Sequence, residues 1–415
     1  MLAPVRQMTP PAWMQALETI RVMAALKAED GFPATLFVGG CVRNALLGAP
    51  VEDIDIATIL PPETVMERLA RAGIHVIPTG LAHGTVTAVL NGKSFEITTL
   101  RVDVETFGRR ARVRYTDDWH ADARRRDFTV NSLFADDGGY IYDPTGQGLS
   151  DLSARRIRFV GDPVTRIHED YLRILRFFRF YAQYGKGEPD SDALLACREL
   201  ADKLALISKE RITAEFLKIV AVRDPVNTLE IMIENRIVPS LFGPGYDGAV
   251  MERLCGFQNR YDLCSLEARL VVIAGFSEGA FEHMTSALVL SLARQRSCRG
   301  LLTLLQKHDG LITAALSGES QTRILIYRYG DGLAVQALFL AAARGTDAHH
   351  LPDLLALVRS WTPPTFPLTG ADLLTAGVPE GPAIGLAMKT AEDWWVSEDF
   401  QPDRSACLEK ALSTA

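Results

Sequence analysis

The stretch that decides the fold is "LFVGGCVRNALLGAPVEDIDIAT", residues 36–58. An apolar run ends in two glycines, a short helical pattern follows, and the stretch closes with two aspartates one residue apart. The run and "DIDIAT" predict strands, and the residues between them predict a helix at 41–47. Side chains at i and i+2 of a strand project from one face, so we expect Asp53 and Asp55 to point the same way.

Two carboxylates held together repel each other unless a cation neutralises them. Mg²⁺ suits such a pair because it binds a few carboxylates together with phosphate oxygens of a substrate. Asp53 and Asp55 therefore predict a catalytic magnesium site, although a lone pair of this kind is also compatible with an exposed polar strand face. Glu96, in "SFEITTLR", could approach as a third catalytic carboxylate, or it could simply face solvent.

The glycine turn before the helix predicts an anion site. Gly39 and Gly40 permit close backbone approach, the helix N-terminus carries partial positive charge, and Arg43 lies at the mouth of the turn. "NGKS" at 91–94 looks like the end of a phosphate-binding loop, but that motif requires glycine where Thr87 stands, so a Walker-type site is rejected.

Two further segments are rich in arginine. "RRRDFTVNSLFAD", residues 124–136, predicts phosphate binding by arginines such as Arg126, with a salt bridge to Asp127 holding one guanidinium; a purely structural ion pair is the alternative. The residues 107–122 before it have few apolar anchors and form a candidate mobile segment.

The second segment is "HEDYLRILRFFRFYAQY", residues 168–184, whose periodicity predicts one amphipathic helix. On that helix Asp170, Arg173, Arg176 and Arg179 would form a single stripe. Cytosine and adenine both present an amine donor beside a ring-nitrogen acceptor, which a carboxylate and an arginine can match. Asp170 and Arg173 could therefore select CTP and ATP.

Composition bounds the class of protein. The 415 residues are 47% hydrophobic and 23% charged, with a net charge of −7, which excludes a chain that coats nucleic acid indiscriminately. Neither a membrane-spanning run nor a signal-peptide pattern is expected. The six cysteines and eight histidines lack metal-ligand spacing, which favours free thiols in a reducing cytoplasm and no zinc site.

The chain divides into two parts by pattern. Up to about residue 160 helices and strands mix: a helix at 12–28, a helix after 62, a hairpin turning at Asn91-Gly92, and a small strand pair within 138–163. From about residue 165 helical periodicity takes over, with loops at 243–249 and 361–370. The fold class is α+β, with a small mixed or antiparallel sheet.

Several of these stretches together resemble the class II tRNA nucleotidyltransferases, the CCA-adding enzymes, which share their head with bacterial poly(A) polymerases in the polymerase beta-like superfamily. The resemblance covers residues 36–242 and includes "GGCVRNALLG…DIDIAT", "HGTVTAVLNGKSFEITTLR", "RRDFTVNSL", "DPTGQGLSDLSARRIRFVGDP", "RIHEDYLRILRFFRF" and "ERITAEFLKI". It implies a catalytic head at 1–160, a helical neck that recognises the base at 161–242, and a helical body and tail that bind tRNA at 243–415.

The resemblance also implies roles for single residues and an activity. Asp53 and Asp55 would bind Mg²⁺, Gly40 and Arg43 would contact the nucleotide, and Asp170 with Arg173 would act as the template for the base. The triphosphate and sugar would be surrounded by Arg126, Arg176 and Arg179. The implied activity is addition of CCA to tRNA 3′ ends from CTP and ATP, with release of pyrophosphate.

One residue departs from the family pattern, and three rival functions stay open. Asn44 stands where the family has aspartate, which leaves the pairing made by that aspartate in doubt. The rivals are a poly(A) polymerase, a partial enzyme that adds only CC or only A, and a non-catalytic RNA-binding module.

Overall fold

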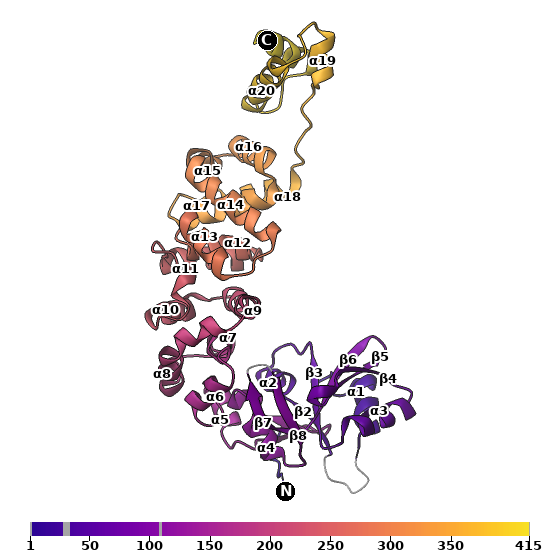
Figure 1. Ribbon diagram of the computed structural model, residues 1–415. Helices are drawn as coiled ribbons and strands as arrows, with labels where there is room; N and C mark the ends of the chain where they lie inside the picture. Colours follow the sequence, from indigo (N-terminus) through magenta and orange to yellow (C-terminus); the bar gives the residue numbers. More distant parts are fainter. Residues whose placement is uncertain (1, 28–33, 108–109, 415) are drawn as a thin grey trace. The chain divides into compact units, whose positions relative to one another are not determined.

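The computed structural model describes residues 2–27, 34–107 and 110–414, with the backbone alone at 103–107 and 110–112. The chain forms two compact units (Figure 1). The first comprises Met1–Val222 and Asn227–Val238, and the second comprises Arg223–Val226 and Pro239–Ala415. The first unit holds the predicted head and most of the predicted neck.

An eight-stranded mixed sheet forms the centre of the first unit, in the order β1-β10-β9-β2-β3-β6-β5-β4. Only β3 and β6 are paired in parallel; the other neighbours are antiparallel. The strands are β1 (Arg6–Gln7), β2 (Thr35–Val38), β3 (Ile54–Thr58), β4 (His75–Gly80), β5 (Thr85–Leu90), β6 (Lys93–Thr99), β9 (Phe134–Ala135) and β10 (Tyr140–Tyr142). A separate hairpin consists of β7 (Arg101–Phe107) and β8 (Arg110–Tyr115). The predicted α+β fold class with a mixed sheet is confirmed.

Strand β2 is buried along its whole length and pairs with β3 on one side and β9 on the other. It ends at Val38, and the next residue, Gly39, has a φ of +72° and is the N-cap of α2 (Gly40–Leu47). A residue with a side chain is strained in that conformation, which explains why glycine begins this turn. The turn places the N-terminus of α2 beside strand β3.

The predicted hairpin is present. Strands β5 and β6 pair antiparallel around Asn91 and Gly92, which have φ values of +50° and +79°, as a tight two-residue turn requires. Strand β4, which the sequence analysis did not predict, pairs with the outer edge of β5. Its side chains are mostly exposed, so it lacks the alternation that marks a half-buried strand.

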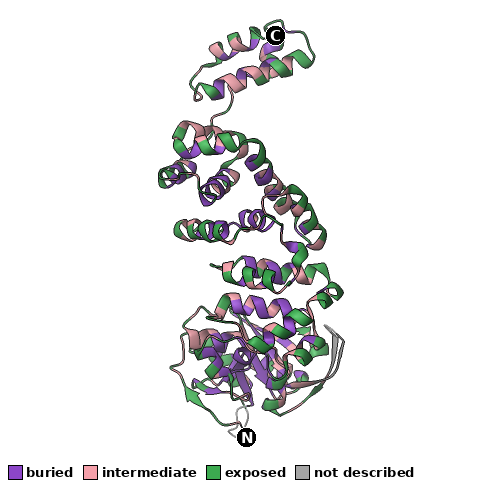
Figure 2. Ribbon diagram, turned by 90° about the vertical axis from the view of Figure 1, so that its left-hand side faces the viewer, coloured by how far each residue is buried: buried purple, intermediate pink, exposed green. Residues whose placement is uncertain are grey.

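The described residues of the first unit form ten α-helices, the last of which begins at Val226, the final residue of the short stretch assigned to the second unit. They are α1 (Leu17–Ala25), α2, α3 (Pro62–Arg71), α4 (Trp119–Arg124), α5 (Gly148–Ser153), α6 (Pro163–Glu169), α7 (Arg173–Tyr184), α8 (Ser191–Glu199), α9 (Lys209–Val220) and α10 (Val226–Glu234). Phe128 links the head to α7, since its ring centroid lies 4.9 Å from that of Phe159 and 5.0 Å from that of Phe180. Figure 2 shows buried residues gathered on the sheet and on the packed faces of these helices.

The predicted single helix over 168–184 is wrong. Helix α6 ends at Glu169, Asp170 has an extended backbone with φ −156° and ψ 107°, and α7 begins only at Arg173. The Asp170 carboxylate accepts a hydrogen bond from the backbone N–H of Leu172 at 3.2 Å. Aspartate side chains compete in this way for the N–H groups that a continuous helix would use internally. Asp170 therefore stands apart from the arginine stripe of α7.

Two other predictions need correction. The helix expected at 12–28 covers only Leu17–Ala25 among the described residues. The segment 138–163 contains one strand, β10, and the helix α5 instead of a strand pair; its other β contact is the isolated bridge from Phe159 to Phe128.

The mobility expected for residues 107–122 stays a prediction. The segment includes β8 and the start of α4, while residues 108–109 lie outside the described part of the chain.

The described part of the second unit is helical. Its α-helices are α11 (Gly248–Tyr261), α12 (Leu266–Ile273), α13 (Glu278–Ala287), α14 (Leu292–Lys307), α15 (Asp309–Ser317), α16 (Glu319–Tyr329), α17 (Asp331–Ala343), α18 (Leu351–Ser360), α19 (Gly370–Thr375), α20 (Pro382–Ser397) and α21 (Arg404–Leu412). Short 3₁₀ segments complete the chain: η1 (Leu81–His83), η2 (Thr129–Asn131), η3 (Ala201–Leu206) and η4 (Pro239–Leu241). Residues 361–369 form the predicted loop before α19.

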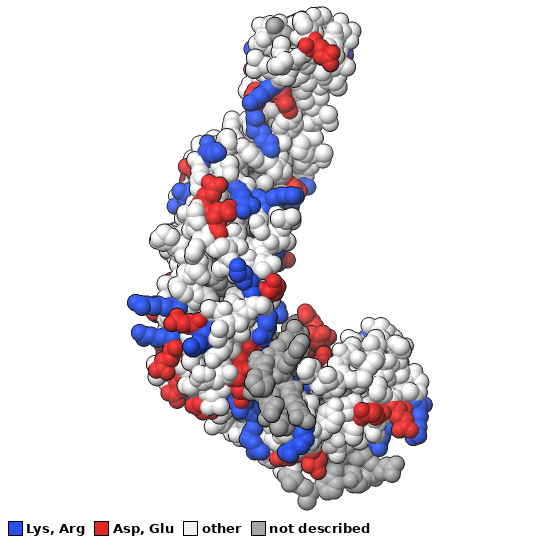
Figure 3. Space-filling view, in the orientation of Figure 1, with Lys and Arg blue, Asp and Glu red and all other residues white. Residues whose placement is uncertain are grey.

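Helices α19 to α21 pack around Trp395, which is 3% exposed. Ile324 and Tyr327 of α16 contact the same cluster. All six cysteines lie among the described residues and are unpaired; five are buried and Cys264 is exposed. None of the described helices is both long and apolar enough to cross a bilayer. In Figure 3 acidic and basic side chains are interspersed over the visible face.

Candidate nucleotide-binding site

A cavity of about 520 Å³ lies within the first unit, where the glycine turn, the arginine segment after α4 and the start of α7 meet. Six arginines and three aspartates contribute to its wall. The lining residues are Gly39, Gly40, Arg43, Asp55, Arg125, Arg126, Asp127, Asn131, Asp170, Leu172, Arg173, Arg176, Phe180 and Arg211. The excess of guanidinium groups favours an anionic ligand such as a triphosphate.

A second cavity, of about 440 Å³, shares three lining residues with the first: Gly40, Arg43 and Asp55. Asp53 and Asp55 both line it, as the strand geometry predicts. Asp53 lies one residue before β3 and is exposed, whereas Asp55 is inside the strand and partly buried. The two aspartates thus face a recess next to the arginine-lined cavity.

The surroundings of Asp55 disfavour the ionised form of its carboxyl group. Burial, the charge of Glu96 and the charge of Asp53 raise the pKa of Asp55 to about 6, although Arg126 opposes this shift. Glu96 is the register partner of Asp55 on the parallel strand β6. A divalent cation would relieve this repulsion, and carboxylate oxygens are the ligands that hard cations prefer, so the residues fit such an ion.

Glu96 does not complete a ligand cluster. Within the part of the chain that the structure describes, no three His, Cys, Asp or Glu side chains are grouped closely enough to hold a metal ion. Glu96 is exposed and lines neither cavity. Its role as a third catalytic carboxylate stays a prediction.

Arg43 is held firmly at the mouth of the cavity and is only 6% exposed. Its Nη1 donates to Asn131 Oδ1 at 2.5 Å, and its Nη2 donates to the Tyr184 hydroxyl at 2.8 Å. The guanidinium also lies over the ring of Tyr184, 4.0 Å from the centroid. These contacts fix the cation before any ligand arrives.

Asn44 supplies the remaining support for Arg43. Its Oδ1 accepts from Arg43 Nε at 3.1 Å and from Nη2 at 2.8 Å, while its Nδ2 donates to the carbonyl of Pro50 at 2.8 Å. A neutral amide therefore serves both the arginine and the loop that leads to Asp53. The carbonyl of Pro50 needs a donor, which an aspartate at position 44 would lack.

The arginine segment is paired differently from the prediction. Arg125 and Arg126 both bind Asp122, which was not predicted as a site residue. Asp127 instead binds Arg176 of α7, 49 residues further along the chain, with Nε at 3.0 Å from Oδ2 and a shorter contact from Nη2. The prediction of a salt bridge at Asp127 is confirmed, but its partner comes from a distant element.

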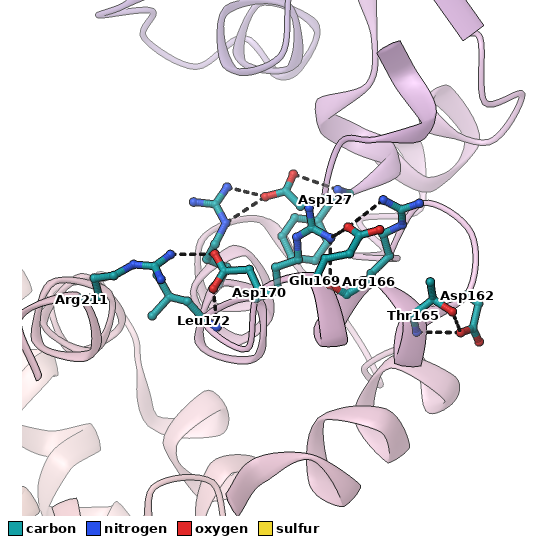
Figure 4. A network of polar contacts seen from close by, with 11 residues as sticks. Asp127, Asp162, Thr165, Arg166, Glu169, Asp170, Leu172 and Arg211 are labelled. Carbon is teal, nitrogen blue, oxygen red and sulfur yellow. Dashed lines mark hydrogen bonds and ion pairs between the residues drawn. The ribbon is translucent and has the colours of Figure 1, made fainter. Parts of the chain in front are cut away.

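The proposed base-recognition residues form separate ion pairs, Asp170 with Arg211 and Arg173 with Glu169. Figure 4 shows Asp170, Glu169 and Arg211 among the polar contacts of this region. Asp170 Oδ2 accepts from Arg211 Nη2 at 2.7 Å. Arg173 Nη1 donates to the carbonyl of Arg166 at 2.8 Å and makes a short contact with the carboxylate of Glu169. Both residues line the cavity, so the break between α6 and α7 brings Asp170 and Arg173 to the same wall.

Arg179 lies over the ring of Phe180, as Arg43 and Arg176 do, but is turned to a different partner. It does not line the cavity and forms an ion pair with Glu215 of α9, with 2.9 Å between Nε and Oε2. Sequence reasoning did not single out five further residues of the site: Asp122, Arg125, Asn131, Tyr184 and Arg211. Arg125 could have been included from its place in "RRRD", and Asp122 from its helical spacing to Arg125 and Arg126. The other three residues act through partners far along the chain and carry no local signal.

Residues 35–158 match the poly A polymerase head domain, and residues 188–249 match the probable RNA and SrmB-binding site of polymerase A. The chain is 36% identical over 392 residues to the mitochondrial CCA tRNA nucleotidyltransferase 1 of Danio rerio, covering 89% of this chain and 85% of the relative. It is 33% identical over 393 residues to a CCA-adding enzyme of Lacticaseibacillus paracasei, covering 93% and 92%.

Among solved structures, the Bacillus stearothermophilus CCA-adding enzyme in complex with CTP matches with a TM-score of 0.76 and 25% identity, covering 98% of each chain. The head-domain match and the fold define a nucleotidyltransferase with a head of the poly(A) polymerase type. The near full-length relatives narrow this class, and the chain belongs to the family of CCA tRNA nucleotidyltransferases, the CCA-adding enzymes. Members of this family generally use divalent metal ions.

Proposed function

We propose that this protein adds the sequence CCA to the 3′ end of tRNA from CTP and ATP and releases pyrophosphate. The observation that carries the proposal is the adjoining pair of cavities, in which an aspartate pair faces a recess beside an arginine-lined pocket. Relatives that match over most of their length bear the names of enzymes with this activity. The anion-binding pocket would hold a nucleoside triphosphate, and the aspartates would lie at the reacting phosphate.

In this proposal Asp53 and Asp55 hold Mg²⁺ through their carboxylate oxygens. Bound there, the ion would supply charge neutralisation for the triphosphate and would lower the pKa of the attacking 3′-hydroxyl. The raised pKa of Asp55 supports this assignment, because a bound cation would offset the burial and the repulsion from Glu96 and Asp53 that raise it.

The arginines of the cavity orient the triphosphate and provide fixed positive charge where the transition state gains negative charge. Arg43 is rigidly placed by Asn44, Asn131 and Tyr184. Arg126 lines the same cavity from the segment after α4, and Arg176 lines it from α7. The backbone at Gly39 and Gly40 allows the phosphates to approach the N-terminus of α2.

Base choice is assigned to Asp170 and Arg173. The carboxylate of Asp170 would accept the amine of cytosine or adenine, and Arg173 would donate to the ring nitrogen. Among the described residues, the side-chain hydrogen bonds of Arg173 are donated by Nη1. Its Nε and Nη2 can therefore donate to a nucleotide base. Uracil would present an acceptor to Asp170, and an unpaired buried polar group costs roughly 1–3 kcal/mol.

The remaining assignments follow the family resemblance. Residues 1–160 would form the catalytic head, 161–242 the base-recognising neck, and 243–415 the tRNA-binding body and tail. Glu96 would be a third catalytic carboxylate beside the aspartate pair. Arg179 would act with Arg126 and Arg176 around the triphosphate and sugar, although it does not line the cavity. The free thiols are compatible with a place in the cytoplasm.

The test is incorporation into a tRNA transcript that lacks CCA, with CTP alone, ATP alone, and both, followed by sequencing of the 3′ ends. We expect CC with CTP alone and CCA with both nucleotides. Repeated addition of A would support a poly(A) polymerase, addition that stops at CC or requires a CC end would support a partial enzyme, and binding without any addition would support an RNA-binding module.

A further inference from the structure

Asp122 is an acidic residue that is completely buried. Its exposed fraction is 0%, and it does not line the cavity. It lies on α4, whose Trp119 packs edge-on against Phe134 of the sheet with 5.3 Å between the ring centroids. Ionised carboxylates are rarely buried this completely unless partners surround them. Its partners therefore define what it does.

Each carboxylate oxygen of Asp122 binds one guanidinium. Oδ1 accepts from Arg125 Nε at 2.8 Å and Nη2 at 2.6 Å, and Oδ2 accepts from Arg126 Nε at 3.1 Å and Nη2 at 2.8 Å. Both arginines line the cavity. Two-point contacts of this kind fix the plane of a guanidinium as well as its position.

The contacts leave the other edge of Arg126 for a ligand. Its Nη1 is not used by Asp122 and lies 3.8 Å from where a side-chain Cβ on Gly39 would be. One carboxylate with two guanidiniums leaves a net charge of about +1 at the cavity wall. A ligand phosphate in the cavity would thus meet an arginine whose orientation is already set.

The same carboxylate reaches a third element. Oδ1 also accepts from the backbone N–H of Arg101 at 3.3 Å, at the first residue of β7. The β7–β8 hairpin is therefore joined at its base to the residue that orients Arg125 and Arg126. Burial alone would raise the pKa of Asp122, but the charges of Arg126 and Arg125 outweigh it and keep the pKa lowered.

We propose that Asp122 is a positioning residue for nucleotide binding, which holds Arg125 and Arg126 toward the triphosphate site and couples them to the base of the β7–β8 hairpin. The inference rests on the proposed function, since it takes a nucleoside triphosphate as the ligand of the cavity. A purely structural buried triad would stabilise the head without changing how CTP binds.

The first experiment compares Asp122→Asn with Asp118→Asn. Both variants remove one negative charge from the same helix region, but Asp118 is an exposed N-cap that binds the neighbouring Arg124. With radiolabelled CTP and Mg²⁺ in equilibrium dialysis, we expect Asp122→Asn to weaken CTP binding roughly tenfold while Asp118→Asn changes it less than about twofold. In steady-state addition assays KM should rise more than kcat falls.

The second experiment separates positioning from structure by a double-mutant cycle. Arg126→Gln keeps a donor for Asp122 but removes the guanidinium. If Asp122 acts through this arginine, the CTP-binding losses of Asp122→Asn and Arg126→Gln are not additive, and the double variant is little worse than Arg126→Gln alone. Fully additive losses, or unchanged CTP binding by folded Asp122→Asn, overturn the positioning role.

The coupling to the hairpin is measured without altering Asp122. Hydrogen exchange of the backbone amides in the peptide covering residues 100–107 should slow when CTP binds to the unaltered protein, and Arg126→Gln should reduce that effect. Equal protection in both proteins, or none in either, overturns the coupling. Absence of CTP binding by the unaltered protein overturns the proposed function and this inference together, whereas normal binding with the failures above overturns the inference alone.

Discussion

At the scale of single residues, Asp55, a proposed metal ligand, lies in an environment that disfavours its ionised form. Its carboxylate is partly buried beside Glu96 and Asp53, and its pKa is raised to about 6. One pKa unit corresponds to about 1.4 kcal/mol, so the metal-free head bears a real penalty for keeping this group ionised. Such a cost is typical of functional positions.

Asp55→Ala should therefore abolish nucleotide incorporation while leaving tRNA binding nearly unchanged, because the tRNA contacts are assigned to other parts of the chain. Because the folded protein disfavours the charge of Asp55, its removal should also leave the melting temperature unchanged or slightly higher. Incorporation, filter binding of tRNA and thermal melting measure the three effects. Asp137→Ala, at an exposed turn, is the matched control; loss of folding in Asp55→Ala alone would contradict a metal-binding role.

Asn44 stands where the family has aspartate, and its hydrogen bonds to Arg43 and Pro50 define its role in this chain. Because its Oδ1 accepts two hydrogen bonds from Arg43, Asn44→Ala should raise KM for CTP about three- to tenfold, equivalent to roughly 1 kcal/mol for the lost contact. Asn44→Asp keeps the acceptor and should lose less. Steady-state kinetics of both variants check this order; an Asn44→Asp enzyme as impaired as Asn44→Ala would show that the donor to Pro50 matters more.

Arg173→Ala should relax base choice more than it weakens triphosphate binding. Arg173 contacts neighbouring groups through Nη1, and the proposed template contact uses the rest of its guanidinium. We expect the ratio of CTP to UTP incorporation to fall by about tenfold or more, the loss corresponding to one charge-assisted hydrogen bond. An unchanged ratio would count against templating, and Arg179→Ala, outside the cavity lining, provides the comparison.

How far residues could be predicted from the sequence depends on whether their partners are local. Asp53, Asp55 and the glycine turn follow from strand and turn geometry within some twenty residues. Arg211 could not be predicted, because its partner Asp170 is 41 residues away and only the fold brings the two together. Asp122 lies three and four residues before Arg125 and Arg126, so its ion pairs follow helical spacing, but the sequence analysis did not use that spacing. Asp127 was recognised as one half of an ion pair, but the identity of Arg176 required the packing of α7 against the head.

At the scale of elements, the boundary between α6 and α7 shows where helical periodicity fails to predict the end of a helix. The apolar periodicity of residues 168–184 continues through Asp170, so a pattern of spacing predicts one helix. The structure breaks it because the Asp170 carboxylate accepts the backbone N–H of Leu172, just before α7, and binds Arg211 on α9. A local side-chain-to-backbone hydrogen bond and a tertiary ion pair here override periodicity, whereas the hairpin at Asn91-Gly92 was predictable because its turn chemistry is local.

The ion pair between the arginine segment and α7 should make the first unit sensitive to acid. Burial alone would raise the pKa of Asp127, but Arg176 and the hydrogen bond from Asn131 hold it below the ordinary value of 3.8. The stabilisation is therefore fully present above about pH 5 and is lost as the pH falls through the lowered folded-state pKa. Asp127→Asn should cost roughly 1–3 kcal/mol at pH 7.

Melting temperatures from pH 7 down to pH 3 measure this effect. The difference between Asp127→Asn and the unaltered protein should shrink as the pH falls, because protonation removes the same charge. Asp137→Asn should melt like the unaltered protein throughout. A difference that is constant with pH would mean that the hydrogen bonds of Asp127, and not its charge, provide the stabilisation.

At the scale of the whole molecule, the cavity and the tail can be tested separately. Every residue that lines the nucleotide cavity belongs to the first unit, and the Trp395 cluster belongs to the second. Trp395→Ala should destabilise the tail by about 3–5 kcal/mol through loss of a buried aromatic side chain. CTP affinity should stay within about twofold of the unaltered protein, since among the described residues Trp395 shares no contact partner with those that line the cavity.

Limited proteolysis checks the first half of this prediction, with faster cleavage expected in residues 361–369, and equilibrium dialysis with CTP checks the second. Leu386→Ala, at an exposed position of the same helix, is the control. A tenfold loss of CTP binding in Trp395→Ala would show that the two units are energetically coupled. The helical character of this second half was predictable from periodicity, whereas the contact of α16 with the tail was not.

The cysteines differ in exposure, so one of them can be labelled selectively. Burial raises the pKa of Cys41 and of Cys255 to about 11, which keeps these thiols protonated and slow to react at neutral pH. Cys264 is the one exposed thiol among all six, each of which is described. A maleimide fluorophore should thus attach at a single, known point beside α12 in the natural sequence, giving a spectroscopic reporter on the second unit without any engineering.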